Sequence, residues 1–456
     1  MTSGGKRAPA SVPRFDQVGE RSASGASRHD GLRGRGTPLR LIVLCPHFDP
    51  DTAPTGRVIS RIVDELAQRD HELHVVTALP WYREHAVEPG WQAALGRREL
   101  TLWGSVTRVN PFPGDDKRNL ARRALGFAGF SLLAGLAALR AGGVLRRADA
   151  VIAMSPPLTM GLTGRLAAWA HRAPLVFNIQ DVFPDAAVRT GAITDRRVIA
   201  AASWLERVSY RLADAVTVLS GDLAANVRGK LPARRSATVH TIPNFVDTVA
   251  IHPADRITAY RAELGIGDEP VVLYAGNVGF SQSLDLLLTA ARRLPHVTFL
   301  VNGEGSRRAE LLERAAGLPN VRFGRYVPDD RLVELLATGD VHVVPLRAGL
   351  ASVSVPSKTY SILAAGRPVL AAIDPGTEIP RLLAASGAGV AVPPDDPDAF
   401  CAAVASLAAD VGRRAAMGEA GRRWVEAVAS PAAVAAAYEQ LVHTLRRRRL
   451  APRDRR

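Results

Sequence analysis

The hydrophobic residues of the first half of the chain fall into short runs separated by amphipathic stretches. The run PLRLIVLCPHF reaches a proline near its end, at Pro46, which is typical of a buried parallel strand leading into a turn. Residues 56–69 carry apolar side chains at helical spacing, and residues 71–77 form the next apolar run. Strand, helix and strand in this order predict a βαβ unit. Further strands of the same parallel sheet are expected at residues 148–154, 174–179 and 215–219.

The same alternation starts again near residue 270. We expect strands at PVVLYAG, VTFLVNG, VRFGRYV, VHVVPL, RPVLAAI and AGVAVPP, with helices over residues 284–293 and 306–316. The connector at residues 240–253 contains the proline and asparagine of HTIPNFVDT. The predicted fold class is therefore α/β, with two Rossmann-like domains that face a central cleft at the carboxyl ends of their strands.

These patterns divide the chain into five segments. Residues 1–38 are rich in Gly, Ser, Arg and Pro without hydrophobic periodicity, which predicts a disordered tail. We expect the first domain over residues 39–245 and the second over residues 246–430. A C-terminal helix over residues 431–447 is expected to pack back on the first domain, and residues 448–456 form a basic tail.

The most hydrophobic segment, residues 124–139, holds sixteen residues without a charge and is flanked by arginines. It is shorter than the roughly 18–20 residues that span a bilayer. A helix that lies in the membrane interface is one interpretation, and a buried helix of the first domain is the other.

The charge and the cysteines of the chain indicate its binding partners and its cellular compartment. The net charge is +14, and residues 446–456 contain seven arginines. Such a tail suits nucleic acid or the inner face of a membrane, although a solvated tail gives the same pattern. Without an RNA-binding signature we expect no nucleic-acid partner. Cys45 and Cys401 are expected to be buried small hydrophobes, and no apolar signal region is seen, so we expect a cytoplasmic protein, associated with the inner face of the membrane.

Two glycine-containing turns follow strands of the second half. Gly276, Asn277, Gly279 and Gln282 lie between a strand and a helix, where glycines let the backbone approach a diphosphate and the helix N-terminus supplies donors. The loop around Gly303 has the same position after the next strand, and Ser306 is a candidate N-cap. Tight-turn geometry is the alternative for both sets of glycines, and taken alone the first turn is a weak signal.

A loop of small residues and hydroxyls with one lysine precedes a predicted helix. It contains Arg347, Ser354, Ser357 and Lys358. A lysine at a helix N-terminus is poorly placed for the helix dipole, so a bound anion would offset the repulsion. We therefore expect Lys358 to be functional, with a solvated surface lysine as the alternative.

Carboxylates also follow a strand of the first half. Asp181 comes just after the run at 174–179 and is a candidate for holding or deprotonating a hydroxyl. Asp185 either shares that role or caps the next helix. The pairs around Pro50 and Pro397 fit an Asp-x-Asp pattern, but their central prolines predict turns, so we expect no metal and no cofactor.

Over residues 40–445 the chain resembles the family 4 glycosyltransferases with the GT-B fold, in particular the WbuB/WcaI-like branch of cell-surface polysaccharide assembly. The resemblance is carried by the order of seven segments: HFDPDTAPTGRVISRIVDELAQRDHELHVVTALPWY, NIQDVFPDAAV, TVLS, HTIPNFVDT, VLYAGNVGFSQSLDLLL, VPSKTYSILAAGRPVLA and TEIPRLLAASGAGVAVPPDDPDAF.

The resemblance implies a retaining, metal-independent transfer of a sugar from a nucleotide-sugar, with the acceptor held by the first domain and the donor by the second. It places the loop at Thr55 and Gly56, the turn at residues 276–282 and the loop at residues 354–359 against the donor. Thr377 and Glu378 are implied near the end of the cleft.

The chain also departs from the family pattern. The paired glutamates of many relatives fall on Val353 and Ser361, and the basic pair that clamps the diphosphate falls on Asn277 and Gln282. The resemblance therefore leaves Lys358, with Arg347, to neutralise the diphosphate.

We expect transfer from a nucleotide-sugar to a lipid-linked sugar or polysaccharide in cell-envelope or exopolysaccharide assembly. A nucleotide-sugar epimerase of the same architecture and a non-catalytic module that binds nucleotide-sugars are the alternatives.

Overall fold

The computed structural model describes residues 37–83, 86–92, 96–112, 120–144, 146–185, 188, 194–351 and 356–450. Residues 1–36 of the predicted tail over residues 1–38, and residues 451–456 of the basic tail over residues 448–456, lie outside this range. From Pro38 onward the chain forms one compact unit that contains two α/β sheets.

The first sheet has eight strands in the order β3-β4-β2-β1-β5-β6-β7-β8. All neighbouring strands are parallel except the β3–β4 hairpin. The strands are β1 (Arg40–Leu44), β2 (Glu72–Ala78), β3 (Gly96–Thr101), β4 (Gly104–Val109), β5 (Ala150–Ser155), β6 (Leu175–Ile179), β7 (Ala215–Val218) and β8 (Val239–Thr241).

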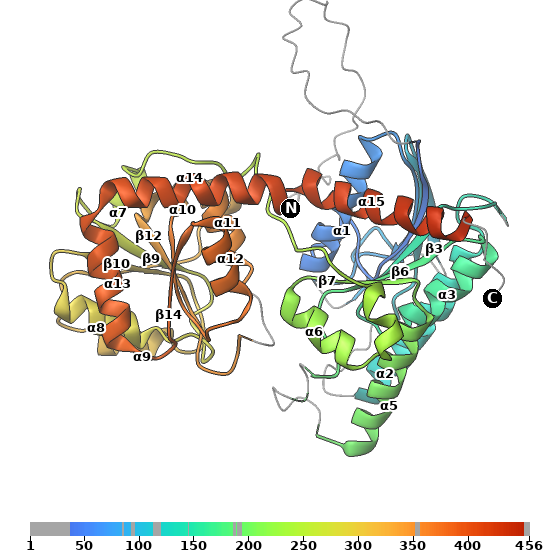
Figure 1. Ribbon diagram of the computed structural model, residues 1–456, viewed down its shortest axis with the longest axis horizontal. Helices are drawn as coiled ribbons and strands as arrows, with labels where there is room; N and C mark the ends of the chain where they lie inside the picture. The colour runs from blue at the N-terminus through green and yellow to red at the C-terminus, as the bar shows by residue number, and fades with distance from the viewer. Residues whose placement is uncertain are drawn as a thin grey trace, which may run out of the picture. The chain divides into compact units, whose positions relative to one another are not determined.

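Alternation along β1 creates two cores, one on each face of this sheet. Leu41 and Val43 pack against α1 (Pro54–Ala67) and the C-terminal helix α15 (Pro431–Leu450). Ile42 and Leu44 belong to the core of the opposite face. The helices of that face are α2 (Leu120–Ala138), α3 (Met160–Ala170), α5 (Arg196–Leu212) and α6 (Gly221–Gly229), seen in Figure 1.

The second sheet is entirely parallel, with six strands in the order β11-β10-β9-β12-β13-β14. Its strands are β9 (Val271–Ala275), β10 (Thr298–Asn302), β11 (Val321–Gly324), β12 (Val341–Pro345), β13 (Val369–Ala372) and β14 (Gly389–Val392). Its helices are α7 (Ala259–Glu263), α8 (Asp285–Arg293), α9 (Arg308–Arg314), α10 (Leu332–Thr338), α11 (Lys358–Ala364), α12 (Glu378–Ser386), α13 (Pro397–Ala409) and α14 (Val411–Val428). The described residues also form two short 3₁₀ turns, Ala233–Thr238 and Asp329–Arg331.

The C-terminal helix α15 is part of the core of the first half. Its Val434, Leu441 and Val442 are buried with residues of α1 and of the first sheet. Tyr438 receives a hydrogen bond of 2.7 Å from the side-chain amide of Asn178 on β6. A helix at the end of the chain therefore supports the strand that leads to Asp181.

The hydrophobic segment over residues 124–139 lies in α2 and the turn that follows it. Phe130, Ala134 and Ala138 are buried in the core, whereas Leu132 and Leu136 are exposed. Within the described residues, no helix combines the length and apolar character that crossing a bilayer requires. The segment is thus a helix of the first half with one apolar stripe left uncovered.

The expected N-cap at Ser306 is wrong. Helix α9 begins at Arg308, and its N-cap position is Arg307, which makes no side-chain capping bond. The reason is a contact between loops: the Arg307 amide donates to the carbonyl of Val278, 3.0 Å away, and this contact keeps the chain out of the helix until the next residue. Cys45 and Cys401 are both buried and free, as predicted.

Candidate functional site

A cavity of about 250 Å³ opens at the carboxyl end of the second sheet. Strands β9 and β10 end in its wall, and helices α10 and α11 close its sides. Its lining mixes apolar side chains with a few polar groups, as small-molecule sites do. The lining residues are Ala275, Gly276, Asn302, Tyr326, Val327, Asp329, Leu332, Leu335, Leu336, His342, Lys358, Ser361 and Ile362.

Lys358 is the one lysine of this lining and the first residue of α11. Its Nζ lies 3.9 Å from the centroid of the Tyr274 ring, so an aromatic face contacts the ammonium group. Among the described residues, Lys358 forms no hydrogen bond and no ion pair. Burial lowers the pKa of its ammonium group to about 8. A poorly compensated cation at a helix N-terminus favours the binding of an anion.

The two glycine turns meet beside this lysine. Gly276 has φ +141°, and a Cβ added there would come within 2.9 Å of the Lys358 Nζ. Gly303 has φ +148°, and an added Cβ would lie 1.9 Å from the carbonyl oxygen of Gly276. Both positions therefore require glycine. The structure brings Gly276, Gly303 and Lys358 together, as a phosphate-binding site would need.

The remaining residues of the first turn form hydrogen bonds that stabilise the turn. Gln282 accepts a hydrogen bond of 3.1 Å from the Gly279 amide, and the Asn277 carbonyl accepts one of 2.6 Å from the Tyr274 hydroxyl. Arg347 is half-buried and donates from Nε to the Phe280 carbonyl, 2.8 Å away. Arg347 thus lies against the turn, close to where an anion would enter.

The loop before α11 is described only in part. Ser354 and Val353 lie outside the described residues. Ser357 is exposed and occupies the N-cap position of α11 without a side-chain capping bond. Ser361, the second position where relatives carry glutamate, lines the cavity one helical turn after Lys358.

Thr377 and Glu378 begin α12 and are already engaged. The Thr377 hydroxyl donates to the Asp374 carbonyl, 2.7 Å away. The Glu378 carboxylate accepts a hydrogen bond of 3.0 Å from the Gly221 amide and pairs with Arg381 at 3.2 Å. In this arrangement Glu378 connects α12 to the first turn of α6, and does not line the cavity.

In the first half, Asp181 follows β6 by two residues and is exposed. Its carboxylate forms no hydrogen bond or ion pair with the described residues, and partial desolvation raises the pKa of the carboxyl group. Asp185 differs, because its carboxylate accepts from Asn226 at 2.8 Å and pairs with Lys230 at 3.0 Å. The Asp185 carboxylate therefore holds α6 and the residue that follows it.

Thr55 and Gly56 lie in the first turn of α1, beside a pair of residues that our reading of the sequence missed. The Nδ1 of His47 lies 2.7 Å from a carboxylate oxygen of the fully buried Asp51 side chain. A Cβ added to Gly56 would come within 2.9 Å of the His47 Cβ, so the small residue makes room for the imidazole. The His-x₃-Asp spacing directly after the first strand was the signal that could have identified the pair.

Aromatic rings hold His47 in place. It stacks on Trp81 with ring centroids 5.5 Å apart, and the edge of the Tyr82 ring approaches at 5.6 Å. Because the Asp51 carboxylate accepts from Nδ1, the neutral imidazole presents Nε2 as an acceptor. The buried indole Nε1 of Trp81 has no hydrogen-bond partner within the described residues. These groups suit recognition of a hydroxylated ligand.

Neither Asp-x-Asp pair resembles a metal site. Asp51 bonds to His47, and Asp396 caps α13 by accepting from the amides of Asp398 and Ala399. No group of three or more metal-ligating side chains is found in the part of the chain that the structure describes. Metal independence itself stays a prediction.

Comparison with known proteins connects both halves to one class of enzyme. A family model described as "Glycosyl transferase 4-like domain" matches residues 55–244, and one described as "Glycosyl transferases group 1" matches residues 269–410. WcaI of Escherichia coli, described as a glycosyl transferase of colanic acid biosynthesis, is 29% identical over 380 residues, which cover 80% of this chain and 91% of WcaI. The glycosyltransferase WbjE of Pseudomonas aeruginosa is 28% identical over 302 residues, covering 63% of this chain and 72% of WbjE.

Solved structures show the same fold at low sequence identity. Sucrose-phosphate synthase from Thermosynechococcus elongatus superposes with a TM-score of 0.64 at 19% identity, covering 89% of this chain and 99% of that one. Anabaena HepE in complex with UDP-glucose superposes with a TM-score of 0.59 at 15% identity, covering 89% of this chain and all of that one.

Proposed function

Because the chain belongs to the family 4 glycosyltransferases of the WcaI-like kind, with the GT-B fold, we propose that it is a retaining, metal-independent enzyme of cell-envelope polysaccharide assembly. It moves a sugar from a nucleotide-sugar donor to a lipid-linked or polysaccharide acceptor. The observation that carries this proposal is the uncompensated Lys358 in a cavity at the strand ends, where two glycine turns meet.

The donor is assigned to the second half. Its nucleoside enters the cavity of about 250 Å³, and its diphosphate lies at the mouth between Gly276 and Lys358. The backbone comes close there because no side chain fills the space at Gly276 or Gly303. Lys358 neutralises negative charge that grows on the diphosphate as the bond to the sugar breaks. Arg347 adds a second positive charge from the rim.

The acceptor is assigned to the first half. Asp181, with its raised pKa, orients the acceptor hydroxyl and receives its proton. The oxygen of that hydroxyl bonds to the anomeric carbon on the face from which the nucleoside diphosphate leaves, as the bond from that carbon to the diphosphate oxygen breaks, so the anomeric configuration is retained. The His47 Nε2 accepts a hydrogen bond from a second hydroxyl of the acceptor, which fixes its approach. Water must be excluded during transfer, because hydrolysis competes.

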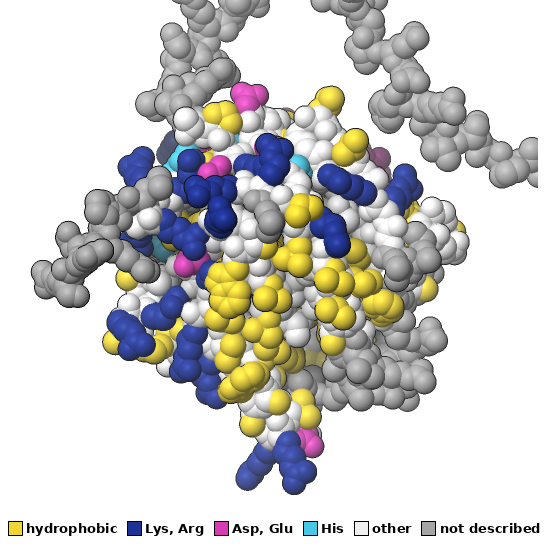
Figure 2. Space-filling model, turned by 90° about the vertical axis from the view of Figure 1, so that its right-hand side faces the viewer, with side chains coloured by type: hydrophobic (Ala, Val, Ile, Leu, Met, Phe, Trp, Pro, Cys, Tyr) yellow, Lys and Arg dark blue, Asp and Glu magenta, His cyan; other side chains and the backbone are white. Residues whose placement is uncertain are grey.

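We also propose association with the inner face of a membrane, and an exposed apolar surface of the first half supports it. Helix α3 lies between α2 and α5. Their large exposed apolar side chains form what we call the apolar face, and Figure 2 shows apolar side chains gathered on this side of the molecule with basic groups around them. Trp residues suit the headgroup region, and arginines suit anionic lipids. The members of the apolar face are Leu132, Leu136, Leu166, Trp169 and Trp204.

A panel of UDP-, GDP- and dTDP-sugars with bacterial lipid extract tests the enzymatic proposal. We expect one donor to release its nucleoside diphosphate in step with the appearance of a glycosylated product of retained anomeric configuration. An epimerase would change the donor sugar without acceptor, and a binding module would retain the donor without turnover. Either of those outcomes would overturn the proposal.

A further inference from the structure

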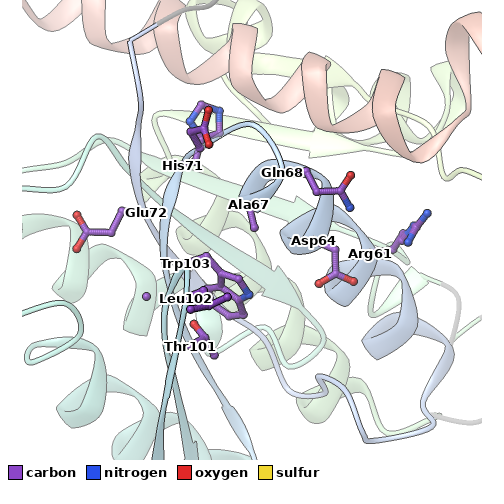
Figure 3. Close-up of a pocket in the computed structure, with 11 residues that line it drawn as sticks. Arg61, Asp64, Ala67, Gln68, His71, Glu72, Thr101, Leu102 and Trp103 are labelled. Carbon is purple, nitrogen blue, oxygen red and sulfur yellow. The ribbon is translucent and has the colours of Figure 1, made fainter. Parts of the chain in front are cut away.

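A second cavity, of about 790 Å³, lies at the opposite end of the first sheet from Asp181 and His47. Strands β2 and β4 begin in its wall, whereas Asp181 and His47 follow the carboxyl ends of their strands. As Figure 3 shows, one side of the cavity is formed by α1 and the residue after it. The other side is formed by Thr101, Leu102 and Trp103 at the turn of the β3–β4 hairpin.

The polar groups of this cavity are incompletely paired. Within the described residues, the buried Nε of Arg61 and the buried Oγ1 of Thr101 have no hydrogen-bond partner. The Asp64 side chain is exposed at the rim of the cavity, where its carboxylate is free to accept hydrogen bonds, and partial desolvation raises its pKa. Buried polar groups in native proteins are nearly always satisfied, so the orphaned Arg61 donor and the orphaned Thr101 hydroxyl call for a ligand or water.

The charges of the lining argue against an anionic ligand. The lining holds three acidic side chains, Asp64, Asp70 and Glu72, of which Glu72 pairs with Arg40 at 3.4 Å. Its basic side chains are Arg61 and His71, and burial lowers the pKa of His71. Arg61 also lies 3.6 Å from both Glu65 and Asp247. A nucleotide or a phosphate would therefore meet more negative than positive charge.

The apolar groups indicate what kind of neutral ligand fits. Trp103 packs against the core while lining the cavity, and Leu102 beside it is fully exposed. An indole next to carboxylate, amide and hydroxyl groups matches a sugar ring, which has apolar C–H faces and a rim of hydroxyls. The Gln68 amide offers both a donor and an acceptor to that rim. The volume falls within the range of about 300–1,000 Å³ that small-molecule sites occupy.

We propose that this cavity is a carbohydrate-binding site, separate from the transfer site, for a neutral sugar unit of a glycan. Asp64 accepts hydrogen bonds from sugar hydroxyls, Arg61 Nε donates to a sugar oxygen, and Trp103 covers an apolar face of the ring. A glycan bound at this site stays attached to the enzyme even when the other end of the glycan is not in the transfer site. The proposal concerns binding alone and does not depend on which donor the enzyme uses.

Saturation-transfer NMR with cellotetraose, maltotetraose and mannotetraose tests this site, with trigalacturonate as the anionic comparison. We expect at least one neutral tetrasaccharide to bind more tightly than trigalacturonate, and saturating UDP not to displace it. Asp64→Ala and Trp103→Ala should each weaken binding at least tenfold, whereas Trp169→Ala, an exposed tryptophan elsewhere, should leave it unchanged. If Trp103→Ala fails to fold, the single variants Thr101→Val and Asp64→Ala test the site instead, and both should weaken binding of the tetrasaccharide.

Three results would overturn the proposal: no neutral tetrasaccharide bound by the wild type, binding that Asp64→Ala leaves intact, or displacement by UDP. The last would place the sugar in the transfer site. The experiment measures glycan binding and not sugar transfer. Its outcome therefore tests the carbohydrate-binding site even if the proposed enzymatic activity is wrong.

Discussion

The ammonium group of Lys358 rests 3.9 Å from the centroid of the Tyr274 ring, and no carboxylate of the described residues pairs with it. An aromatic face stabilises a cation less than a carboxylate does, so the lysine keeps much of its attraction for a bound anion. The family glutamate position that follows it, Ser361, adds no negative charge to this cavity. The pair therefore leaves a positive charge available to a bound diphosphate in the proposed donor site.

The pH dependence of donor use follows from this environment. Burial lowers the pKa of Lys358 to about 8, so the side chain is charged below that pH and loses its proton above it. We expect kcat/KM for the donor to be level on the acidic side of about pH 8 and to fall up to tenfold per pH unit above it. A profile from pH 6 to 10 checks this. In Lys358→Arg the alkaline limb should disappear, and a wild-type profile that stays level to pH 10 would contradict the account.

The dyad of His47 and Asp51 should act on the acceptor. His47→Gln removes the oriented Nε2, so the KM for the acceptor should rise at least tenfold while donor binding stays within twofold. Asp51→Asn should have the same effect, because it perturbs the imidazole orientation. Steady-state kinetics with separately varied substrates measures both. A merely structural dyad would lower activity with both substrates together, along with the urea midpoint.

The apolar face should carry membrane binding. Deleting residues 124–139 would remove the buried Phe130 and Ala134, so point substitutions are the cleaner test. We expect Trp169→Ser with Trp204→Ser to reduce co-sedimentation with phosphatidylglycerol-containing vesicles at least tenfold. Ile257→Ser with Val411→Ser, which alters exposed apolar residues of the second half, is the matched control. Equal co-sedimentation of the two double variants would contradict the proposal that the apolar face binds the membrane.

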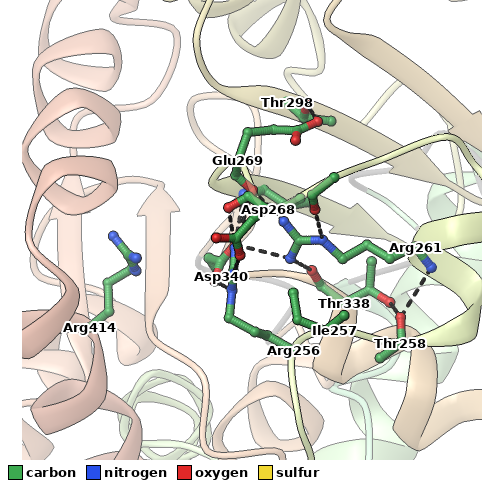
Figure 4. A network of polar contacts seen from close by, with 12 residues as sticks. Arg256, Ile257, Thr258, Arg261, Asp268, Glu269, Thr298, Thr338, Asp340 and Arg414 are labelled. Atoms are coloured by element: carbon green, nitrogen blue, oxygen red, sulfur yellow. Dashed lines mark hydrogen bonds and ion pairs between the residues drawn. The ribbon is translucent and has the colours of Figure 1, made fainter.

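The stability of the second half should depend on Asp340. Figure 4 shows its carboxylate between two arginines: Arg256 donates to it at 2.6 Å, and Arg261 lies 3.4 Å away. Burial alone would raise the pKa of Asp340, but the hydrogen bonds from Arg256 and the Val271 amide hold it below the ordinary value of 3.8. This stabilisation is present above about pH 4 and is lost as the pH falls through the lowered pKa.

Asp340→Asn should therefore destabilise the protein by about 3–5 kcal/mol, since it leaves the buried Arg261 without a carboxylate partner and Arg256 with only the exposed Asp268. Urea unfolding at pH 7 measures the change. The matched control is Asp268→Asn, which removes an exposed partner of Arg256 and should cost less than about 1 kcal/mol. Equal midpoints for the two variants would refute the role given to Asp340.

The parallel strands were predictable because they are buried on both faces and therefore read as continuous apolar runs. The edge hairpin was not. Strand β3 is mostly exposed and carries Arg97, Arg98 and Glu99, so its sequence lacks the alternation that marks a strand. The cavity that contains Thr101 and Trp103 could not be expected without that hairpin.

The candidate site was predictable only where local sequence carries the chemistry. Lys358 and Gly276 come from local patterns, since each lies at a strand-to-helix junction. The Tyr274 contact depends on how two elements pack, and the sequence shows no sign of it. Gln282 and Glu378 were expected at the donor. In the structure their side chains accept hydrogen bonds from the backbone amides of Gly279 and Gly221, and these contacts depend on the folded backbone, which the sequence does not show.

The most direct test of the central claim is sugar transfer in EDTA, measured side by side for the wild type and Lys358→Ala with the best donor of the panel. We predict that the wild type forms glycosylated product in EDTA, and that Lys358→Ala loses about ten- to a hundredfold in kcat/KM, as expected for a lost charge-assisted contact of roughly 1.5–3 kcal/mol. Transfer that requires a divalent metal, or undiminished transfer by Lys358→Ala, would contradict the account.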